Sequence, residues 1–119
     1  MSKYADVYLL PIPAKNIGAY RKLASAAGKL FIKHGALRYR EYVVSDLNAE
    51  DAVPFPKRIK LKDGETLVYA SVEFKSESHR NKVMKSLCHD PAMDLLMPPK
   101  PLFDYKRMVY GGFKILVDL

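Results

Sequence analysis

The sequence predicts an α+β fold with the element order β-α-β-β-α-β. Two observations predict it: some segments are rich in β-branched and aromatic residues and stop at turn residues, and others repeat apolar residues every three or four positions. This order is that of a ferredoxin-like unit, in which a four-stranded antiparallel sheet carries two main helices on one face. The 119 residues, 49% hydrophobic and 28% charged, predict one domain over 1–119 whose core needs no disulfide.

The first half of the chain predicts a strand, a helix and a second strand. Residues 4–12 are rich in strand-forming residues and end at a Pro-Ile-Pro run, which cannot continue a ladder. Residues 16–34 place apolar side chains at helical spacing, and Gly35 follows as a C-terminal cap. Residues 37–44 are again typical of a strand, although charged side chains interrupt it.

The middle of the chain combines a long loop with two further elements. Residues 45–65 are rich in turn residues, and within them 58–61 alternates as an edge strand would. A loop this long is either functional or contains a short element. Residues 66–74 predict a strand, and Ser76 predicts the N-cap of a helix that ends near Cys88.

The C-terminal part predicts a short helical turn and a last strand. Asp90-Pro91 is an N-cap followed by a proline at the first helical position. Residues 104–117 alternate as a strand, and the glycine pair Gly111-Gly112 predicts a bulge or a sharp twist in it.

Both faces of the strands at 66–74 and 104–117 carry apolar side chains. A sheet face in contact with water should be polar, so we expect a second sheet to cover the face that the helices leave open. The simplest cover is the sheet of a two-fold mate, which predicts a homodimer.

The cysteine content and the chain start predict a cytoplasmic location. Cys88 is the only cysteine, and the first residues lack the basic and apolar pattern of a signal peptide. No apolar run approaches the ~20 residues that cross a bilayer, so no membrane contact is predicted. Cys88-His89 and His79 lack a second Cys/His pair, so no metal site is predicted, and no cofactor motif is present.

The C-terminal run FDYKRMVYGGF at residues 103–113 resembles the YbaA-like family of small bacterial proteins of unknown function. The likeness extends over nearly the whole chain, including Tyr4-Ala5-Asp6, Gly35-Ala36-Leu37-Arg38 and Asp90-Pro91. The family belongs to the dimeric α/β-barrel group. The resemblance implies a ferredoxin-like unit that pairs into a barrel as a homodimer, and it implies no reaction.

Charged side chains within strands are the candidate functional groups, because burying them is costly unless they are paired. Paired carboxylates and arginines can bind an anionic or enolisable small molecule, and a carboxylate can move protons. The alternative is that these charges form salt bridges within the barrel and the dimer. The catalytic candidates are Asp6, Glu73, Arg107, Tyr110 and His34, and the first three form the preferred set. The ligand-binding candidates are Tyr8, Arg38, Arg40, Tyr42 and Tyr69.

His34 has two interpretations. Related dimeric barrels include haem-degrading enzymes and cofactor-free oxygenases, so the resemblance allows a haem ligand or a proton shuttle. A histidine in a last helical turn also caps carbonyls and is favoured by the helix dipole.

The formal charge of +7 is concentrated in residues 1–34, which carry six basic groups and one acid. Lys15, Lys22 and Lys29 are spaced by seven and form one helical stripe close to Lys33. Such a stripe can hold nucleic-acid phosphates or be a solvated face, and it lacks the aromatic residues on which bases stack.

We therefore expect a cytoplasmic homodimer that binds a small organic molecule beside its sheet, with or without transforming it. The alternatives are a non-catalytic structural or regulatory dimer and a nucleic-acid-associated protein that uses the basic helix.

Overall fold

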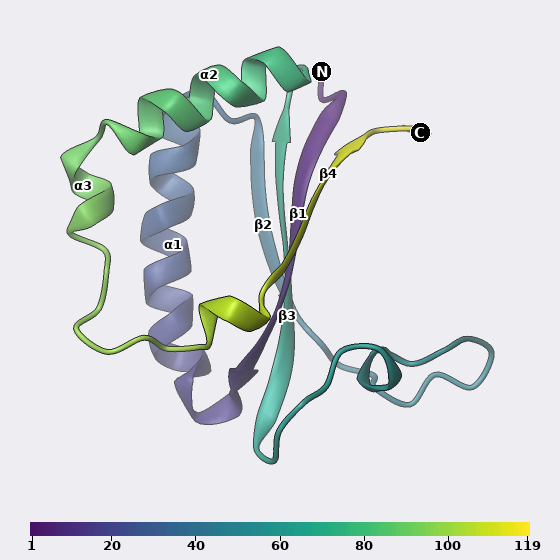
Figure 1. The fold of residues 1–119 in the computed structure, drawn as a ribbon. Helices are drawn as coiled ribbons and strands as arrows, with labels where there is room; N and C mark the ends of the chain where they lie inside the picture. Colours follow the sequence, from purple (N-terminus) through teal and green to yellow (C-terminus); the bar gives the residue numbers. More distant parts are fainter.

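The computed structural model describes residues 1–119, and its four strands form one antiparallel sheet in the order β2-β3-β1-β4. The strands are β1 (Tyr4–Pro13), β2 (Arg38–Val43), β3 (Glu65–Phe74) and β4 (Val109–Lys114). The helices are α1 (Ile17–Lys33), α2 (Glu77–Cys88) and the single turn α3 (Pro91–Asp94), and they lie on one side of the sheet (Figure 1). Three 3₁₀ turns complete the chain: η1 (Ala14–Asn16), η2 (Phe55–Lys57) and η3 (Tyr105–Arg107). The predicted α+β, ferredoxin-like order is confirmed.

The register of β1 divides the sheet into two faces. Asp6 lies opposite Val72 of β3 and Gly112 of β4, and Leu9 lies opposite Tyr69 and Val109. Because side chains alternate along a strand, the even-numbered residues of β1 face the helices and the odd-numbered ones face away. We call the second face the open face.

The helix α1 ends as its sequence predicts. Gly35 has a φ of +112°, a left-handed conformation that few residues other than glycine adopt. This lets the Ala36 N–H donate to the Phe31 carbonyl at 3.0 Å and the Gly35 N–H donate to the Ile32 carbonyl at 3.0 Å. The chain thereby turns into β2 with its last helical carbonyls satisfied.

The predicted N-caps of α2 and α3 are confirmed as well. The Ser76 hydroxyl accepts from the His79 N–H at 3.0 Å, and the Asp90 carboxylate accepts from the Ala92 N–H at 2.9 Å. None of the helices combines the length and the apolar character that crossing a membrane requires.

Two predicted strands differ from the structure. Residues 58–61 are not a strand: the loop between β2 and β3 forms η2 just before them and extends to the side of the sheet opposite the helices (Figure 1). The last strand begins at 109 rather than 104, because the Asp104 carboxylate accepts from the Lys106 N–H at 3.0 Å and caps η3.

Of the bulge or sharp twist predicted at Gly111-Gly112, the bulge is absent, since β4 pairs with β1 without interruption from Val109 to Lys114. The second glycine makes room for a ring instead. A Cβ atom on Gly112 would lie 2.1 Å from the Tyr4 hydroxyl oxygen.

Two hydrophobic clusters occupy the layer between the sheet and the helices. One contains Leu10, Ile12, Val68 and Phe103, and the other contains Ala36, Val72, Phe74 and Val83. Both use residues of β1 or β3 that face the helices. Side chains fill only part of the space between the two clusters.

Candidate functional site

A cavity of about 290 Å³ lies between α1 and the sheet, and residues of both hydrophobic clusters line it. Of its 17 lining residues, 16 are hydrophobic. The remaining one is Glu41 of β2. This volume lies just below the usual range of small-molecule sites, about 300–1,000 Å³.

The segment between α3 and η3 forms the outer wall of this cavity. The Asn16 side-chain amide donates to the Leu102 carbonyl at 2.8 Å and ties this segment to the start of α1. Met97 and Tyr105 line the cavity and are 63% and 42% exposed, so the cavity reaches solvent beside them.

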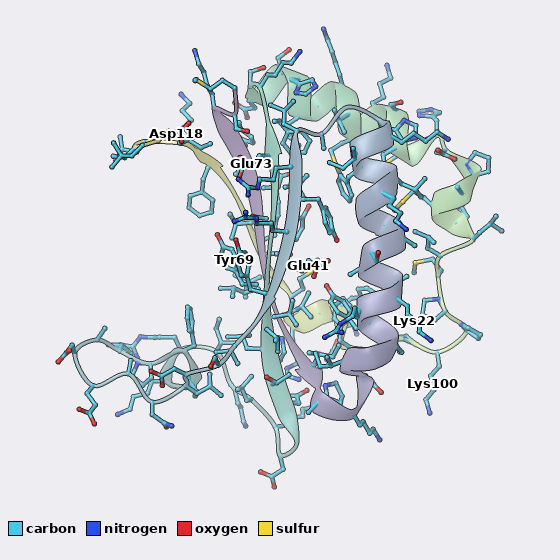
Figure 2. The ribbon with its side chains drawn as sticks, turned by 180° about the vertical axis from the view of Figure 1, so that it is seen from behind. Lys22, Glu41, Tyr69, Glu73, Lys100 and Asp118 are labelled. Atoms are coloured by element: carbon cyan, nitrogen blue, oxygen red, sulfur yellow. The ribbon has the colours of Figure 1, made fainter.

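Glu41 reaches the cavity because of the register of β2. It lies opposite Ala70, which faces the helices, whereas its neighbours Arg40 and Tyr42 point to the open face. Figure 2 shows Glu41 on the α1 side of the sheet, and Tyr69 and Glu73 on the other side.

Two tyrosine hydroxyls hold the Glu41 carboxylate. Tyr20 of α1 donates to Oε1 and Tyr39 of β2 donates to Oε2. We call these three residues the Tyr-Glu-Tyr group. Burial raises the pKa of both hydroxyls, and the nearby carboxylate raises both further. Both tyrosines therefore stay protonated donors at neutral pH, and Glu41 is the acceptor.

The cavity contains no basic residue. A neighbouring hollow of about 280 Å³ shares the Tyr-Glu-Tyr group and includes Arg21, but Arg21 makes no ion pair with Glu41. Chemically, the site presents an apolar wall and one carboxylate that can accept a further hydrogen bond or a proton.

A second polar cluster lies next to the cavity and is centred on Asp6, which is fully buried. Arg80 of α2 donates from Nε to Asp6 Oδ2 at 2.9 Å, and Tyr110 donates to Asp6 Oδ1 at 2.9 Å. Arg80 also donates from Nη2 to the Tyr110 hydroxyl at 2.6 Å. All of the Asp6 charge is thereby compensated within the protein.

Tyr8 connects the two clusters. Its ring lines the cavity and lies 5.0 Å from the ring of Tyr110, between centroids. Burial, with Asp6 nearby, raises the pKa of Tyr8 to about 12.

The structure brings together Asp6, Tyr8 and Tyr110 from the sequence candidates, but it does not join Asp6 to Glu73 and Arg107. Glu73 lies on the open face, opposite Arg38. Arg107 lies beyond the other end of the sheet, where it donates to Glu65 at 2.7 Å and to the Lys60 carbonyl at 2.6 Å. Within one chain these three residues therefore do not come together.

The remaining ligand-binding candidates face away from the cavity. They occupy the open face of β2 and β3, and they are Arg38, Arg40, Tyr42 and Tyr69. The Arg40 guanidinium donates to the Tyr42 hydroxyl at 3.2 Å.

His34 lies outside the cavity and joins three helices. Its ring nitrogens lie 2.7 Å from the Ser86 hydroxyl and 2.6 Å from the Asp90 carboxylate. The hydrogen bond with His34, and then that from the Ala92 N–H, lower the pKa of Asp90 to about 2. The His34 ring therefore links α1 to α2 and α3 through side chains, and neither of its two partners is the helix carbonyl that the capping interpretation expected. No group of three or more His, Cys, Asp or Glu side chains is arranged to hold a metal.

The sequence candidates did not include the Tyr-Glu-Tyr group or Arg80. A signal for each exists in the sequence. Glu41 lies two residues from Tyr39 and so shares its strand face, and Arg80 shares a helical face with the buried Val83 and Leu87.

The basic stripe is exposed, although only part of it is helical, because Lys15 lies in η1 and not in α1. Lys15, Lys22 and Lys29 all lie at the surface, and Figure 2 shows Lys22 on the side of α1 that faces away from the sheet.

Comparison with known proteins agrees with this architecture. The chain is 34% identical over 116 residues to the uncharacterized protein YbaA of Escherichia coli K12, and the match covers 98% of both chains. YbaA of Shigella flexneri matches to the same extent. A solved structure described as a dimeric ferredoxin-like protein, from an uncultured marine organism, aligns over the whole of both chains with a TM-score of 0.53 at 12% identity.

The family comparison agrees with these relatives. Residues 3–105 match the family described as a protein of unknown function, DUF1428. That match covers most of the chain, and YbaA is similar along its whole length. The chain therefore belongs to the DUF1428 family.

Proposed function

We propose that this protein binds a small, largely apolar organic molecule in the cavity between α1 and the sheet. The observation that supports this proposal is the Tyr-Glu-Tyr group, which places one oriented carboxylate among 16 hydrophobic lining residues. Apolar walls with few, well-placed polar groups are typical of small-molecule sites.

The cost of the arrangement supports a functional role. A hollow lined by apolar side chains leaves apolar surface unburied, and a carboxylate among apolar groups adds a desolvation cost. A larger side chain at Ala24 or Ala27, both of which line the cavity, would remove the empty space. A ligand would explain why the space is kept.

The cavity size restricts the ligand to a small molecule. Its volume is about 290 Å³, and a cavity of about 150 Å³ already holds benzene. The ligand is therefore expected to have one or two rings, or an aliphatic body of similar volume.

A cavity-filling variant tests this function. Toluene and naphthalene would be titrated into the protein and followed by amide NMR shifts, with Ala27→Leu as the filled variant. Ala19→Leu is the matched control, because Ala19 lies on the exposed side of the same helix. Shifts around Ala27 in the wild type and the control, lost in Ala27→Leu, support the site. Equal shifts in Ala27→Leu and in the wild type would refute it, as would the absence of a saturable shift in the wild type with these two compounds and with benzylamine.

We further propose that the protein is a homodimer in which two open faces pack together. A row of side chains crosses this face on all four strands: Tyr42, Tyr69, Leu9 and Val109. Tyr42, Tyr69 and Val109 are 46%, 38% and 50% exposed in one chain. Figure 1 shows only the β2–β3 loop and the C-terminal tail on this side of the sheet.

The dimer proposal agrees with two further considerations. A large contiguous apolar patch on a protein surface usually marks an interface. The structure described as a dimeric ferredoxin-like protein has the same fold. In such a dimer the two sheets would pack face to face, and this contact would remove these residues from water. The two paired sheets would together form a barrel.

Light scattering tests the dimer. Val109→Glu places a charge in the apolar row and should convert a particle of twice the chain mass into the monomer. Leu95→Glu introduces the same charge at a residue that is 85% exposed beside the helices and should leave the dimer intact. A monomeric wild type at micromolar concentration contradicts the proposal, as does a dimer that Val109→Glu leaves unchanged.

A further inference from the structure

We infer that the ligand of the cavity is an organic cation, a small amine carried as its ammonium, and that Glu41 is its counter-ion. This inference rests on the proposed function and adds the charge of the ligand.

The first argument is the unbalanced charge of the site. Both Glu41 oxygens are hydrogen-bonded to tyrosine hydroxyls, which are neutral partners, and no ion pair involves Glu41. Asp6 provides the contrast, because Arg80 pairs with it. Glu41 is half-buried, and a carboxylate that is partly withdrawn from water is commonly paired with a cation, whereas no side chain of the protein forms an ion pair with it.

The second argument is the composition of the wall. Six aromatic residues line the cavity: Tyr8, Tyr20, Phe31, Tyr39, Phe103 and Tyr105. The faces of aromatic rings attract ammonium groups, and aromatic walls are the usual means of binding alkylated ammonium ligands. A carboxylate beside such a wall combines two attractions for the same charge.

The third argument is what the site repels. An anion would lie beside Glu41 with no arginine, lysine or histidine in the lining. Like charges that lie close together beside apolar walls repel, so carboxylates and phosphates are disfavoured. The anionic ligands that the sequence allowed are thus a poor match for this cavity.

The preference is measured with four ligands of one shape: benzylamine as its ammonium, benzyl alcohol, toluene and benzoate. Affinities are determined by calorimetry or NMR at pH 7. We expect benzylammonium to bind at least tenfold more tightly than toluene, and benzoate to show no measurable binding. The Glu41→Gln variant should remove the preference for the ammonium and retain binding of toluene, which also serves as the check that the cavity is intact.

A second variant addresses the aromatic wall. Tyr105→Leu keeps an apolar residue at the mouth and should weaken benzylammonium binding about threefold or more, with little change for toluene.

The outcomes separate this inference from the proposed function. If toluene binds and benzylammonium binds no better, or if benzyl alcohol binds best, the inference is wrong and the cavity remains a ligand site. If the preference for the ammonium persists in Glu41→Gln, another group is the counter-ion, and the inference is also wrong. Failure of all four ligands removes the proposed function itself.

Discussion

Arg80 in α2 donates a hydrogen bond to the buried Asp6 in β1 at 2.9 Å, and the two residues are 74 positions apart in the sequence. The Arg80 side chain is 25% exposed, whereas Asp6 is entirely enclosed. The pair therefore attaches α2 to the centre of the sheet from the solvent side. Its hydrogen bond to the carboxylate raises the pKa of Arg80, which keeps the guanidinium charged.

We predict that Asp6→Ala lowers the free energy of unfolding by about 2 kcal/mol or more. The substitution leaves Arg80 and the Tyr110 hydroxyl without their shared acceptor. Breaking a fully buried pair costs about 3–5 kcal/mol, and solvent around Arg80 reduces that loss. Urea denaturation measures it, with Glu50→Ala in the exposed β2–β3 loop as the control. Equal midpoints for Asp6→Ala and the control would show that the pair contributes nothing.

Two glycines of α1 should respond in opposite directions to the same substitution. A Cβ atom on Gly28 would lie 2.6 Å from Cδ1 of the Tyr39 ring, whereas one on Gly18 meets no atom within 4 Å. Gly28→Ala must displace a ring that supports Glu41, and overpacking costs about 1–3 kcal/mol. Gly18→Ala gains helix propensity of up to about 1 kcal/mol. Thermal denaturation of both variants measures the difference, and the same sign in both would contradict the packing argument.

The Asp90 carboxylate should make stability depend on pH in the acid range. Its pKa in the folded protein is about 2, below the ordinary value of 3.8. A depressed pKa contributes stability that is present above pH 4 and is lost as the pH falls through about 2. Asp90→Asn keeps an oxygen to cap Ala92 and removes the titrating group. Urea midpoints between pH 5 and pH 2 should fall less steeply in this variant than in the wild type. If the urea midpoints of the two proteins fall equally steeply with pH, Asp90 is not the cause of the acid sensitivity.

The buried tyrosines should make the protein sensitive to alkali. Burial and Glu41 raise the pKa of Tyr39 above its ordinary value of 10, and Tyr8 has a pKa of about 12. A raised pKa leaves stability intact below pH 10, and stability falls as the pH rises above that value. Each such group contributes at most about 1.4 kcal/mol per pH unit. Tyr39→Phe should therefore lose stability less steeply above pH 10, although the two proteins share one slope between pH 7 and pH 9. Identical slopes above pH 10 would exclude Tyr39 as a source.

The local signals in the sequence predicted most of the fold because each depends on neighbouring residues. Ser76 and Asp90 cap helices through hydrogen bonds that reach only two or three positions, and Gly35 ends α1 by its own backbone conformation. The predicted start of the last strand was wrong because a local hydrogen bond formed there instead. Asp104 caps a 3₁₀ turn instead of beginning a strand, although the alternation of apolar residues there favours a strand.

Alternation also fixed which side chains share a face, but it does not say which face meets the helices. Glu41 and Arg40 are adjacent in-strand charges, and only the pairing of β2 with β3 turns the first inward and the second outward. The same pairing moves Glu73 to the open face, away from Asp6.

By itself, the sequence determined the order of the elements, their caps and the alternation of their faces, because these follow from backbone geometry over a few residues. The tertiary structure decided that Tyr20 and Tyr39 meet at Glu41 and that Arg80 neutralises Asp6. Those contacts join residues up to 74 positions apart, and their energies depend on burial that exists only once the helices cover the sheet.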